Sequence, residues 1–406
     1  MKVLLVGSGG REHALAWRLA QGDGVEMHAA PGNPGIAELG ECHPVRAHDA
    51  EGLLSLAHTV GADLVLIGPE APLVTGVADE LRHAGIAVFG PSAAAARIEG
   101  SKSFAKEIMR VAGVPTAASL SVARPPCVVK LDGLAAGKGV FVCRTAAQLE
   151  AALKAAAKAG GQVVIEELLE GEELSVFAIC DGSQAIPLAP ARDFKRLAEG
   201  DAGPNTGGMG SFSPVADIGP DRLAEIVATV HAPVLEELSR RGTPFVGLLY
   251  AGLMLTDAGL KVLEFNCRFG DPETQSIVVR LEGDLLGALA AAAGGGDLGE
   301  TDLGARDEAA ITVVLAGGDY PERSDSGGPI GGIEDATAAG ALVFHAGTAV
   351  RNGRLVTNGG RVLNVTAHAP TLAEARTAAY AACERITFPR MRYRRDIAAE
   401  EAGVVR

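Results

Sequence analysis

The first hundred residues alternate short apolar runs with amphipathic helical segments, and this alternation constrains the fold more than any other feature. The apolar run Lys2–Val6 is followed by a glycine turn and a helical pattern over Glu12–Ala20. Strand patterns at Leu64–Ile67 and Gly85–Phe89 flank a helix that we expect over Val74–His83. Strands that alternate with helices at this spacing form a parallel sheet with right-handed crossovers. The sequence therefore predicts an α/β protein that begins with a parallel sheet.

The remaining residues suggest two further domains. The chain has 406 residues, and at roughly 150 residues per domain this length predicts two to four domains. A glycine-rich stretch, Ala291–Gly304, marks a boundary, and short strands with one helix follow it. Little periodicity is visible over Arg192–Pro214, which is typical of a functional loop, and the basic cluster Arg390–Arg395 reads as a solvated tail. We expect domains over residues 1–100, 101–300 and 301–406.

Charge and cysteine usage exclude several classes of protein. With 36 basic and 50 acidic residues, the net charge of −14 opposes binding to nucleic acid or to an anionic membrane. The six cysteines are scattered without a C-x-x-C pair, which indicates reduced thiols. The first apolar run is too short for a signal peptide, and no stretch approaches the ~18 apolar residues of a membrane-spanning helix. We therefore expect a soluble, cytoplasmic protein.

The glycine turn at Gly7–Glu12 joins a strand to a helix. At such a turn, backbone N–H groups and the helix N-terminus can bind phosphate. Its sequence, GSGGRE, lacks the last glycine of the dinucleotide fingerprint because Glu12 stands at the sixth position. A phosphate site and a plain tight turn are equally compatible with this segment, whereas a nicotinamide site is disfavoured.

A second glycine loop, Asp132–Gly139, lies between two predicted strands and carries Lys138. It is not a P-loop, because three residues separate Gly133 from Gly137 and because Gly139 replaces the magnesium-binding Ser or Thr. A plain β-hairpin would not require two glycines around a lysine. The loop is better interpreted as a flexible flap that closes a lysine over phosphates.

The densest polar run follows the strand that contains Glu264 and Asn266. These two residues are two apart, so their side chains share one face of the strand. A carboxylate and an amide oxygen on one face suit a hard cation such as Mg²⁺ that also binds phosphates. Arg268 continues this face and could neutralise a transferring phosphoryl group. The alternative is an exposed sheet face with a polar turn, but the density of the cluster favours a site.

Other candidate segments are weaker. Asn205–Gly210 can form a backbone nest for anions beside the charged run Arg192–Arg196, but a mobile solvated loop explains it equally well. The sequence contains no G-x-S-x-G or H-E-x-x-H motif, and its nine histidines show no spacing typical of metal ligands.

Seven motifs in register over essentially the whole chain resemble those of the glycinamide ribonucleotide synthetase family, a family of ATP-grasp ligases. They are Val6–Trp17, Ser101–Lys106, Asp132–Val140, Gly203–Pro214, Gly247–Met254, Glu264–Gln275, and the paired segments Phe344–Thr348 and Thr357–Leu363. The resemblance implies an α/β ATP-grasp fold with an N-terminal Rossmann-like domain and a small C-terminal mixed β domain.

The resemblance also implies an activity. Members of this family join glycine to 5-phosphoribosylamine in purine biosynthesis. The glycine carboxylate attacks the γ-phosphate of ATP, and the amine then attacks the resulting glycyl phosphate to give glycinamide ribonucleotide, ADP and phosphate. We accordingly expect ATP as co-substrate, Mg²⁺ or Mn²⁺ as the metal, a monomer, and small molecules as the sole partners.

The matching positions imply roles for individual residues. Glu264 and Asn266 would hold the metal, Arg268 and Lys138 would act on the phosphoryl group, and Asp193 would bind the glycine amino group. The nucleotide is expected at Lys102, Lys130, Asp132, Gly133, Gly137, Lys138, Gly139, Glu166, Leu168 and Glu173. The phosphoribosyl substrate is expected at Gly9, Gly10, Lys195, Arg196, Asn205, Gly207 and Gly208.

The chain departs from the family pattern at a few positions. Family members usually have Ala where Leu131 stands and His where Phe194 stands, and the predicted strand Tyr250–Met254 lacks the second carboxylate of many ATP-grasp sites. Two alternatives remain open: an ATP-grasp ligase or carboxylase for another acid, and a nucleotide-binding module without chemistry.

Overall fold

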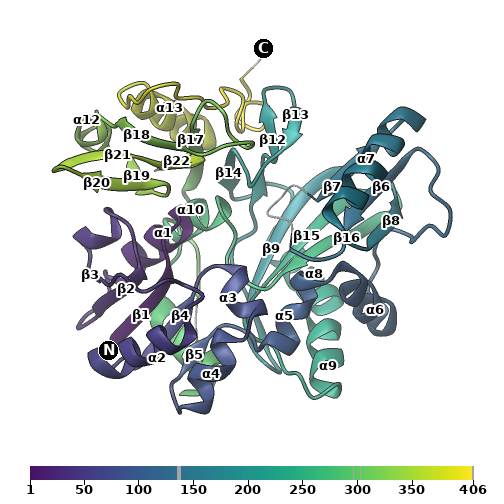
Figure 1. The fold of residues 1–406 in the computed structure, drawn as a ribbon, viewed down its shortest axis with the longest axis horizontal. Coiled ribbons are helices and arrows are strands. Elements are labelled where there is room, and N and C mark those ends of the chain that lie inside the picture. The colour runs from purple at the N-terminus through teal and green to yellow at the C-terminus, as the bar shows by residue number, and fades with distance from the viewer. Residues whose placement is uncertain (135–138, 296, 302, 405–406) are drawn as a thin grey trace.

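The computed structural model describes residues 1–134, 139–295, 297–301 and 303–404. Three lobes surround a central region (Figure 1). The N-terminal lobe lies below the C-terminal lobe, and a small lobe built on β6–β8 and α7 lies at the right of the view. Within the described ranges, no helix has the length and apolar character that crossing a bilayer requires.

The N-terminal domain is a five-stranded parallel sheet in the order β3-β2-β1-β4-β5. Its strands are β1 (Lys2–Gly7), β2 (Glu26–Pro31), β3 (Glu41–Cys42), β4 (Leu64–Ile67) and β5 (Val88–Phe89). Its helices are α1 (Gly10–Leu19), α2 (Ala50–Val60), α3 (Glu70–Val74), α4 (Val77–His83) and α5 (Ala93–Gly100). The prediction of an N-terminal parallel sheet is confirmed. The helix expected over Val74–His83 begins at Val77, because Gly76 adopts a left-handed φ of 92° between α3 and α4.

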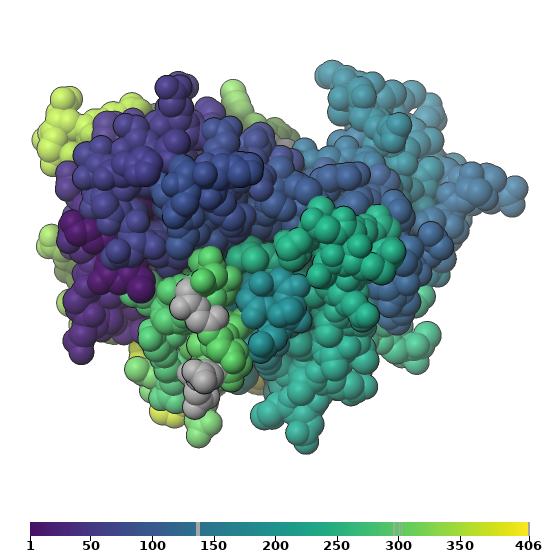
Figure 2. All heavy atoms as spheres, turned by 90° about the horizontal axis from the view of Figure 1, so that it is seen from below, coloured from purple at the N-terminus to yellow at the C-terminus, as the bar shows by residue number. Residues whose placement is uncertain are grey.

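The central domain contains two antiparallel sheets. The smaller sheet has the order β7-β6-β8 and packs against α7 (Ala146–Ala159); its strands are β6 (Cys127–Leu131), β7 (Val140–Cys143) and β8 (Val163–Glu167). The larger sheet has the order β10-β9-β15-β16, with β9 (Glu172–Asp181), β10 (Ala185–Pro187), β15 (Val246–Thr256) and β16 (Gly259–Asn266). Seen from below, the smaller lobe projects from the side of the molecule (Figure 2).

The central part of the chain contains five further α-helices among its described residues. They are α6 (Lys102–Ala112), α8 (Pro220–Ile226), α9 (Ala232–Arg240), α10 (Glu273–Val278) and α11 (Leu285–Ala290), with a π-helical turn at Val227–His231 between α8 and α9. Ser101 caps α6 by accepting a hydrogen bond from the Phe104 N–H at 3.2 Å, and α6 packs against α9. Helix α1 packs against α10, so the first helix of the chain rests on the segment that follows the polar run after β16.

The C-terminal domain is built on a five-stranded sheet with the order β11-β14-β17-β22-β19. Its own elements are β17 (Ala309–Ala316), β18 (Asp325–Pro329), β19 (Leu342–His345), β20 (Thr348–Arg351), β21 (Arg354–Gly359), β22 (Arg361–Ala369), α12 (Ile333–Ala338) and α13 (Leu372–Cys383). Helix α13 covers β17 and β22, and β18, β21 and β20 form a separate three-stranded sheet.

Two strands of the C-terminal sheet come from the segment that we expected to be a loop. Residues 192–213 contain β11 (Arg192–Asp193), β12 (Arg196–Ala198), β13 (Ala202–Asn205) and β14 (Gly210–Ser213), so the prediction of an irregular stretch is wrong there. Strand β14 is antiparallel to β17, with Ser211 opposite Thr312. These strands have two to four residues each, which is too short to show a periodic pattern. The partner of β14 is β17, about a hundred residues later, so no neighbouring sequence indicates the pairing.

The expectation of a solvated C-terminal tail is wrong for Arg394. Only 2% of this residue is exposed. Its guanidinium donates to Asp201 and to Asp396 at 2.8 Å each, and it lies 5.0 Å from the ring centroid of Phe194. Arg394 therefore packs beneath the segment that connects β11 to β13 and contacts it through Phe194 and Asp201.

Candidate active site

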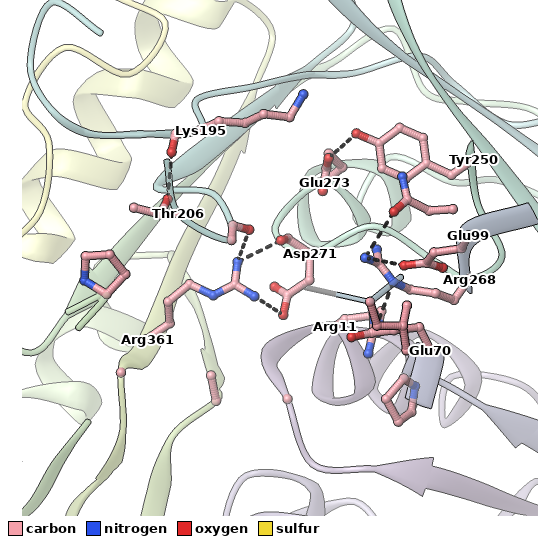
Figure 3. Close-up of a pocket in the computed structure, with 18 of the residues that line it drawn as sticks. Arg11, Glu70, Glu99, Lys195, Thr206, Tyr250, Arg268, Asp271, Glu273 and Arg361 are labelled. Carbon is pink, nitrogen blue, oxygen red and sulfur yellow. Dashed lines mark hydrogen bonds and ion pairs between the residues drawn. The ribbon is translucent and has the colours of Figure 1, made fainter. Parts of the chain in front are cut away.

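A cavity of about 1030 Å³ opens where the three domains meet. Arg11 and Glu70 of the N-terminal domain, Lys130 and Glu264 of the central domain and Arg361 of the C-terminal domain all line it. Figure 3 shows ten of the lining residues by name. Because each domain supplies charged groups, the cavity is complete only when all three domains are folded against one another.

Two lysines converge on one buried carboxylate at the side of the cavity formed by β6 and α6. Lys130 is 6% exposed and Glu166 is 3% exposed. The Lys130 Nζ lies 2.7 Å from Glu166 Oε2, and the Lys106 Nζ lies 2.9 Å from Glu166 Oε1. Lys130 also donates to the carbonyl of Leu263 at 2.7 Å. Glu166 thus uses both of its oxygens to hold two ammonium groups at the cavity wall.

The start of the second glycine loop is tied to the N-terminus of α6. Asp132 Oδ1 accepts from the Lys102 backbone N–H at 2.7 Å, and the Lys102 Nζ donates to the Gly133 carbonyl at 2.9 Å. Burial acts to raise the pKa of Asp132, but hydrogen bonds led by those from Ser103 lower it below its ordinary value. Gly133 and Gly139 line the cavity, whereas Gly137 and Lys138 lie outside the described residues.

Glu264 and Asn266 lie near the end of β16, opposite Gly252 and Tyr250 of β15, and both line the cavity. Burial acts to raise the pKa of Glu264. Nearby cations, led by Lys195, outweigh burial and hold this pKa below its ordinary value. Glu264 therefore carries its negative charge at neutral pH, while Asn266 Oδ1 lies 3.4 Å from an Arg268 nitrogen.

Arg268 is held between two carboxylates of the N-terminal domain. Its Nε lies 3.2 Å from Glu70 of α3, and its Nη2 lies 3.3 Å from Glu99 of α5 (Figure 3). Burial alone would lower the pKa of Arg268, but Glu99 and Glu70 raise it above its ordinary value. The guanidinium is thus permanently charged and fixed in direction at the cavity.

A group of carboxylates lies beside Tyr250. The Asp193 side chain on β11 is 4% exposed, and its Oδ1 lies 3.5 Å from the Lys195 Nζ. Burial raises the pKa of Asp193 to about 7, with Glu273 adding to the rise and Lys195 opposing it. The Tyr250 hydroxyl donates to Glu273 at 2.8 Å (Figure 3). Within the described part of the chain, Asp193 Oδ1 accepts no hydrogen bond, so it is suited to receive one from a bound ammonium group.

The glycine turn that opens α1 is filled by a side chain of the protein. Glu12 accepts from the Gly9 N–H and from the Arg11 Nε at 2.6 Å each. A Cβ on Gly9 would lie 2.7 Å from Glu12 Oε2, and a Cβ on Gly10 would lie 1.9 Å from the Asn364 Nδ2. The turn is therefore closed by Glu12 at the position where the dinucleotide fingerprint has its last glycine.

The C-terminal domain reaches the cavity through Arg361. Its guanidinium donates to the Asp271 carboxylate at 2.8 Å, to the Asp271 carbonyl at 2.7 Å and to the Gly207 carbonyl (Figure 3). The Gly207 N–H in turn donates to the Tyr320 hydroxyl at 2.9 Å. The backbone between β13 and β14 is thus positioned by residues more than a hundred positions later in the chain.

The cavity brings together many of the residues predicted from the sequence. Those that line it are Gly9, Lys102, Lys130, Gly133, Gly139, Glu166, Asp193, Lys195, Gly207, Glu264, Asn266 and Arg268. Those described outside the lining are Gly10, Asp132, Leu168, Glu173, Arg196, Asn205 and Gly208. Glu173 nevertheless accepts a hydrogen bond from the Lys195 Nζ, which places it at the rim of the carboxylate group.

Sequence reasoning missed several lining residues. Lys106 stands four positions after Lys102 on one face of α6, and this spacing could have revealed it. Asp271 and Glu273 lie within the motif Glu264–Gln275, although no role is predicted for either. Glu70 and Glu99 reach Arg268 through the tertiary fold alone, so no local signal marks them.

Comparisons with known proteins match most of the chain. Models of the phosphoribosylglycinamide synthetase N domain, ATP-grasp (A) domain and C domain match residues 1–99, 100–274 and 310–400. A phosphoribosylamine–glycine ligase from Streptomyces coelicolor is 51% identical over 99% of this chain and 100% of its own.

Solved structures extend the comparison to the fold. The crystal structure of a phosphoribosylamine–glycine ligase from Thermotoga maritima covers 98% of this chain and 100% of its own, with a TM-score of 0.84 and 36% identity. A biotin carboxylase domain from Hydrogenobacter thermophilus, solved with MgADP and bicarbonate, covers 97% of this chain and 91% of its own. It has a TM-score of 0.70 but only 19% identity, so this likeness concerns the fold alone.

Proposed function

The chain belongs to the phosphoribosylglycinamide synthetase family, and from this premise we propose how its cavity performs the family's reaction. It is an ATP-dependent phosphoribosylamine–glycine ligase of purine biosynthesis. Like ATP-grasp enzymes in general, it uses ATP and divalent metal ions. The observation that carries the proposal is the convergence on one cavity of paired lysines, an ionised carboxylate and a charged Arg268.

The first chemical step forms a mixed anhydride. An oxygen of the glycine carboxylate attacks the γ-phosphorus of ATP, the bond to the bridging oxygen breaks, and ADP leaves with the electron pair. We assign Arg268 to neutralise charge on the transferring phosphoryl group. The contacts of its guanidinium with Glu70 and Glu99, which orient it before substrate binds, support this assignment.

The second step forms the amide. The amine of 5-phosphoribosylamine attacks the carbonyl carbon of glycyl phosphate, and phosphate leaves with the electrons of the acyl–oxygen bond. The amine loses a proton during this step. We assign the phosphoribosyl group to the space between Gly9 and Gly207, with Lys195 and Arg196 nearby, and Gly10, Asn205 and Gly208 shaping the backbone around it.

The nucleotide lies along β6 and α6 in this proposal. Lys102, Lys130 and Lys106 present ammonium groups for the phosphates, and Lys138 is assigned the same role from its motif. Apolar side chains of Met109, Val140, Leu263 and Phe265 line the cavity nearby and suit a purine ring. Asp132, Gly133, Gly137, Gly139 and Leu168 would shape this subsite, and Glu173 would accept hydrogen bonds from the ribose.

Glu264 and Asn266 are the metal ligands that we assign. Their oxygens fit a hard cation. Burial acts to raise the pKa of Glu264, but nearby cations led by Lys195 outweigh it, so the pKa is low and the carboxylate stays ionised. We assign Mg²⁺ or Mn²⁺ to this position. When bound, the ion neutralises ATP phosphate charge and aligns it for transfer.

The glycine ammonium group is assigned to Asp193. The Asp193 carboxylate is buried, has one oxygen without a hydrogen bond among the described residues, and lies near Glu273. A cationic amino group supplies the missing donor and restores the negative charge that burial opposes. Glycine would then lie with its carboxylate directed toward the phosphates.

We further assign the domain boundaries to residues 1–100, 101–300 and 301–406, and propose that the enzyme acts as a cytoplasmic monomer on small molecules and not on nucleic acid. The net charge of −14 supports the last point. Light scattering coupled to gel filtration tests the monomer directly.

A coupled assay tests the reaction. ADP release should require ATP, glycine and freshly generated phosphoribosylamine together, with one ADP per amide formed. An ¹⁸O label in the glycine carboxylate should pass to inorganic phosphate. Turnover with bicarbonate in place of glycine would support a carboxylase instead, and AMP with pyrophosphate would overturn the acyl phosphate route.

A further inference from the structure

Two histidines and a glutamate meet on the N-terminal sheet, outside the catalytic cavity. His28 lies on β2, Glu41 lies on β3, and His43 directly follows β3; none of the three lines the cavity. The parallel register places His28 beside Glu41. Residues 41 and 43 are two apart on an extended segment and so share a face.

The donor atoms of these side chains point toward one another. His28 Nδ1 lies 3.1 Å from His43 Nε2 and 3.9 Å from Glu41 Oε2. One ligand atom from each of the three residues can be chosen so that all lie within 4.8 Å of one another. A tetrahedral zinc ion with Zn–N bonds of about 2.0–2.1 Å requires its donors to be roughly 3.3 Å apart. The histidine nitrogens are therefore already near this separation.

A fourth residue orients His28. Glu26 Oε1 lies 3.1 Å from His28 Nε2, and the Lys2 ammonium group lies 3.2 Å from the same oxygen. A carboxylate on one ring nitrogen places the proton there and leaves the other nitrogen, Nδ1, with its lone pair free to bind metal.

The burial of the cluster also suits an ion that keeps one water ligand. His28 is 6% exposed, whereas 71% of the Glu41 side chain is exposed. One side of the cluster is therefore fixed within the sheet and the other is open to solvent. Two imidazoles with one carboxylate favour zinc over magnesium, which prefers oxygen donors throughout.

We propose that His28, His43 and Glu41 form a Zn²⁺-binding site, with Glu26 as the residue that positions His28. The site lies between β2 and β3, at the edge of the sheet opposite β5. A bound ion cross-links these two strands. Because it binds the folded state alone, it raises the unfolding temperature of the protein as free Zn²⁺ rises above its dissociation constant.

Isothermal titration of the full-length, metal-free protein with Zn²⁺ tests the proposal. Millimolar Mg²⁺ is kept present so that the catalytic carboxylates are occupied, and Glu264→Gln is titrated in parallel. We expect one Zn²⁺ per chain in both proteins. In His43→Ala, the affinity should fall at least about tenfold, and in Glu26→Gln it should fall about tenfold, as loss of an outer-shell partner does.

His48→Ala is the matched control, because His48 is an exposed histidine five residues beyond His43. Its Zn²⁺ affinity should equal that of the unaltered protein. Cys42→Ser controls for the half-buried thiol between Glu41 and His43. Co²⁺ in place of Zn²⁺ should give visible absorption without a thiolate charge-transfer band.

Circular dichroism verifies that each variant is folded, and Mg²⁺-supported ligase activity adds a second check for every variant except Glu264→Gln. With folding intact, unchanged Zn²⁺ affinity in His43→Ala would overturn the proposal. So would a thiolate band that disappears in Cys42→Ser, or binding that is lost in Glu264→Gln alone. Absence of Zn²⁺ binding to the unaltered protein would overturn it as well.

Discussion

The Arg361 guanidinium on β22 donates to the Asp271 carboxylate at 2.8 Å, across ninety positions of sequence. The same side chain also binds the Asp271 and Gly207 carbonyls. One arginine of the C-terminal domain thus connects the segment after β16 with the backbone between β13 and β14. The position of both segments depends on a residue of a different sheet from β6 and β16.

Arg361→Ala should therefore impair catalysis and, to a smaller extent, stability. Loss of the charged hydrogen bonds should lower the free energy of unfolding by about 2–3 kcal/mol. Misplacement of the Gly207 backbone by about 1 Å should lower kcat/KM for phosphoribosylamine about 10²-fold. Arg390→Ala is the control, because its pair with Asp319 is exposed and should contribute at most about 1 kcal/mol. Activity within twofold of the unaltered enzyme would contradict this assignment.

Glu264→Gln should remove an ionised ligand while keeping the size of the side chain. We expect kcat to fall on the order of 10²-fold and half-saturation to require more Mg²⁺. Stability without nucleotide should fall slightly, since Lys195 and Lys130 lose a charge that offsets theirs. Steady-state kinetics over a Mg²⁺ series measures both effects.

Glu167→Gln is the matched control for this variant. Glu167 also ends a strand and pairs with a lysine, Lys261, at 2.8 Å, but it does not line the cavity. Its kcat should stay within about twofold of normal. An equal rate loss in the two variants would rule out a specific role for Glu264.

Asp193→Asn should lower activity but raise stability, and the gain in stability should depend on pH. Burial raises the pKa of Asp193 to about 7 in the folded chain, whereas an unfolded Asp titrates near 3.9. Between these values the folded state binds the extra proton, so this group's contribution to stability is present below about pH 4 and is lost as pH rises through 7.

The variant should accordingly gain stability over the unaltered protein on the order of a few kcal/mol at pH 8, and this gain should vanish toward pH 4. Its kcat/KM for glycine should fall, and the unaltered enzyme should show a rise in this parameter near pH 7. Urea unfolding at several pH values gives the first result and initial rates give the second. A stability difference that does not change with pH would refute the assignment.

Arg394→Ala should destabilise the protein although Arg394 lies near the C-terminus. Its guanidinium is buried and binds Asp201 and Asp396, and breaking a buried ion pair costs about 3–5 kcal/mol. Arg395→Ala provides the comparison, because 67% of the Arg395 side chain is exposed and its loss should cost less than about 1 kcal/mol. Thermal unfolding of both variants measures the difference, and equal midpoints would be inconsistent with the buried contacts.

The elements with strong local patterns were predictable from the sequence. The strand Leu64–Ile67 appears where it is predicted, because an all-apolar run is a local signal. The strands β11 to β14 were not predictable in this way. They have two to four residues each, and β14 is stabilised by β17.

The residues of the candidate site likewise divide into those with a local sequence signal and those without one. Glu264, Asn266 and Arg268 were identified because they follow one another along a strand and the turn after it. Glu70 and Glu99, which fix Arg268, belong to two helices of another domain and carry no motif. The charge state of Asp193 depends on burial by many elements at once, so sequence alone indicates the residue but not its pKa.

The sharing of one sheet between residues 192–213 and the C-terminal domain has a consequence for synthesis on the ribosome. Strand β14 has no β17 beside it until residue 316 has been translated and has left the exit tunnel. At about 5–20 residues per second, this takes several seconds or more after β14 itself is made. A nascent or prematurely terminated chain therefore contains Lys102 and Lys130 before β14 can pair with β17 and fix β11, the strand that carries Asp193. We therefore expect the proposed role of Asp193 to require that synthesis has passed β17.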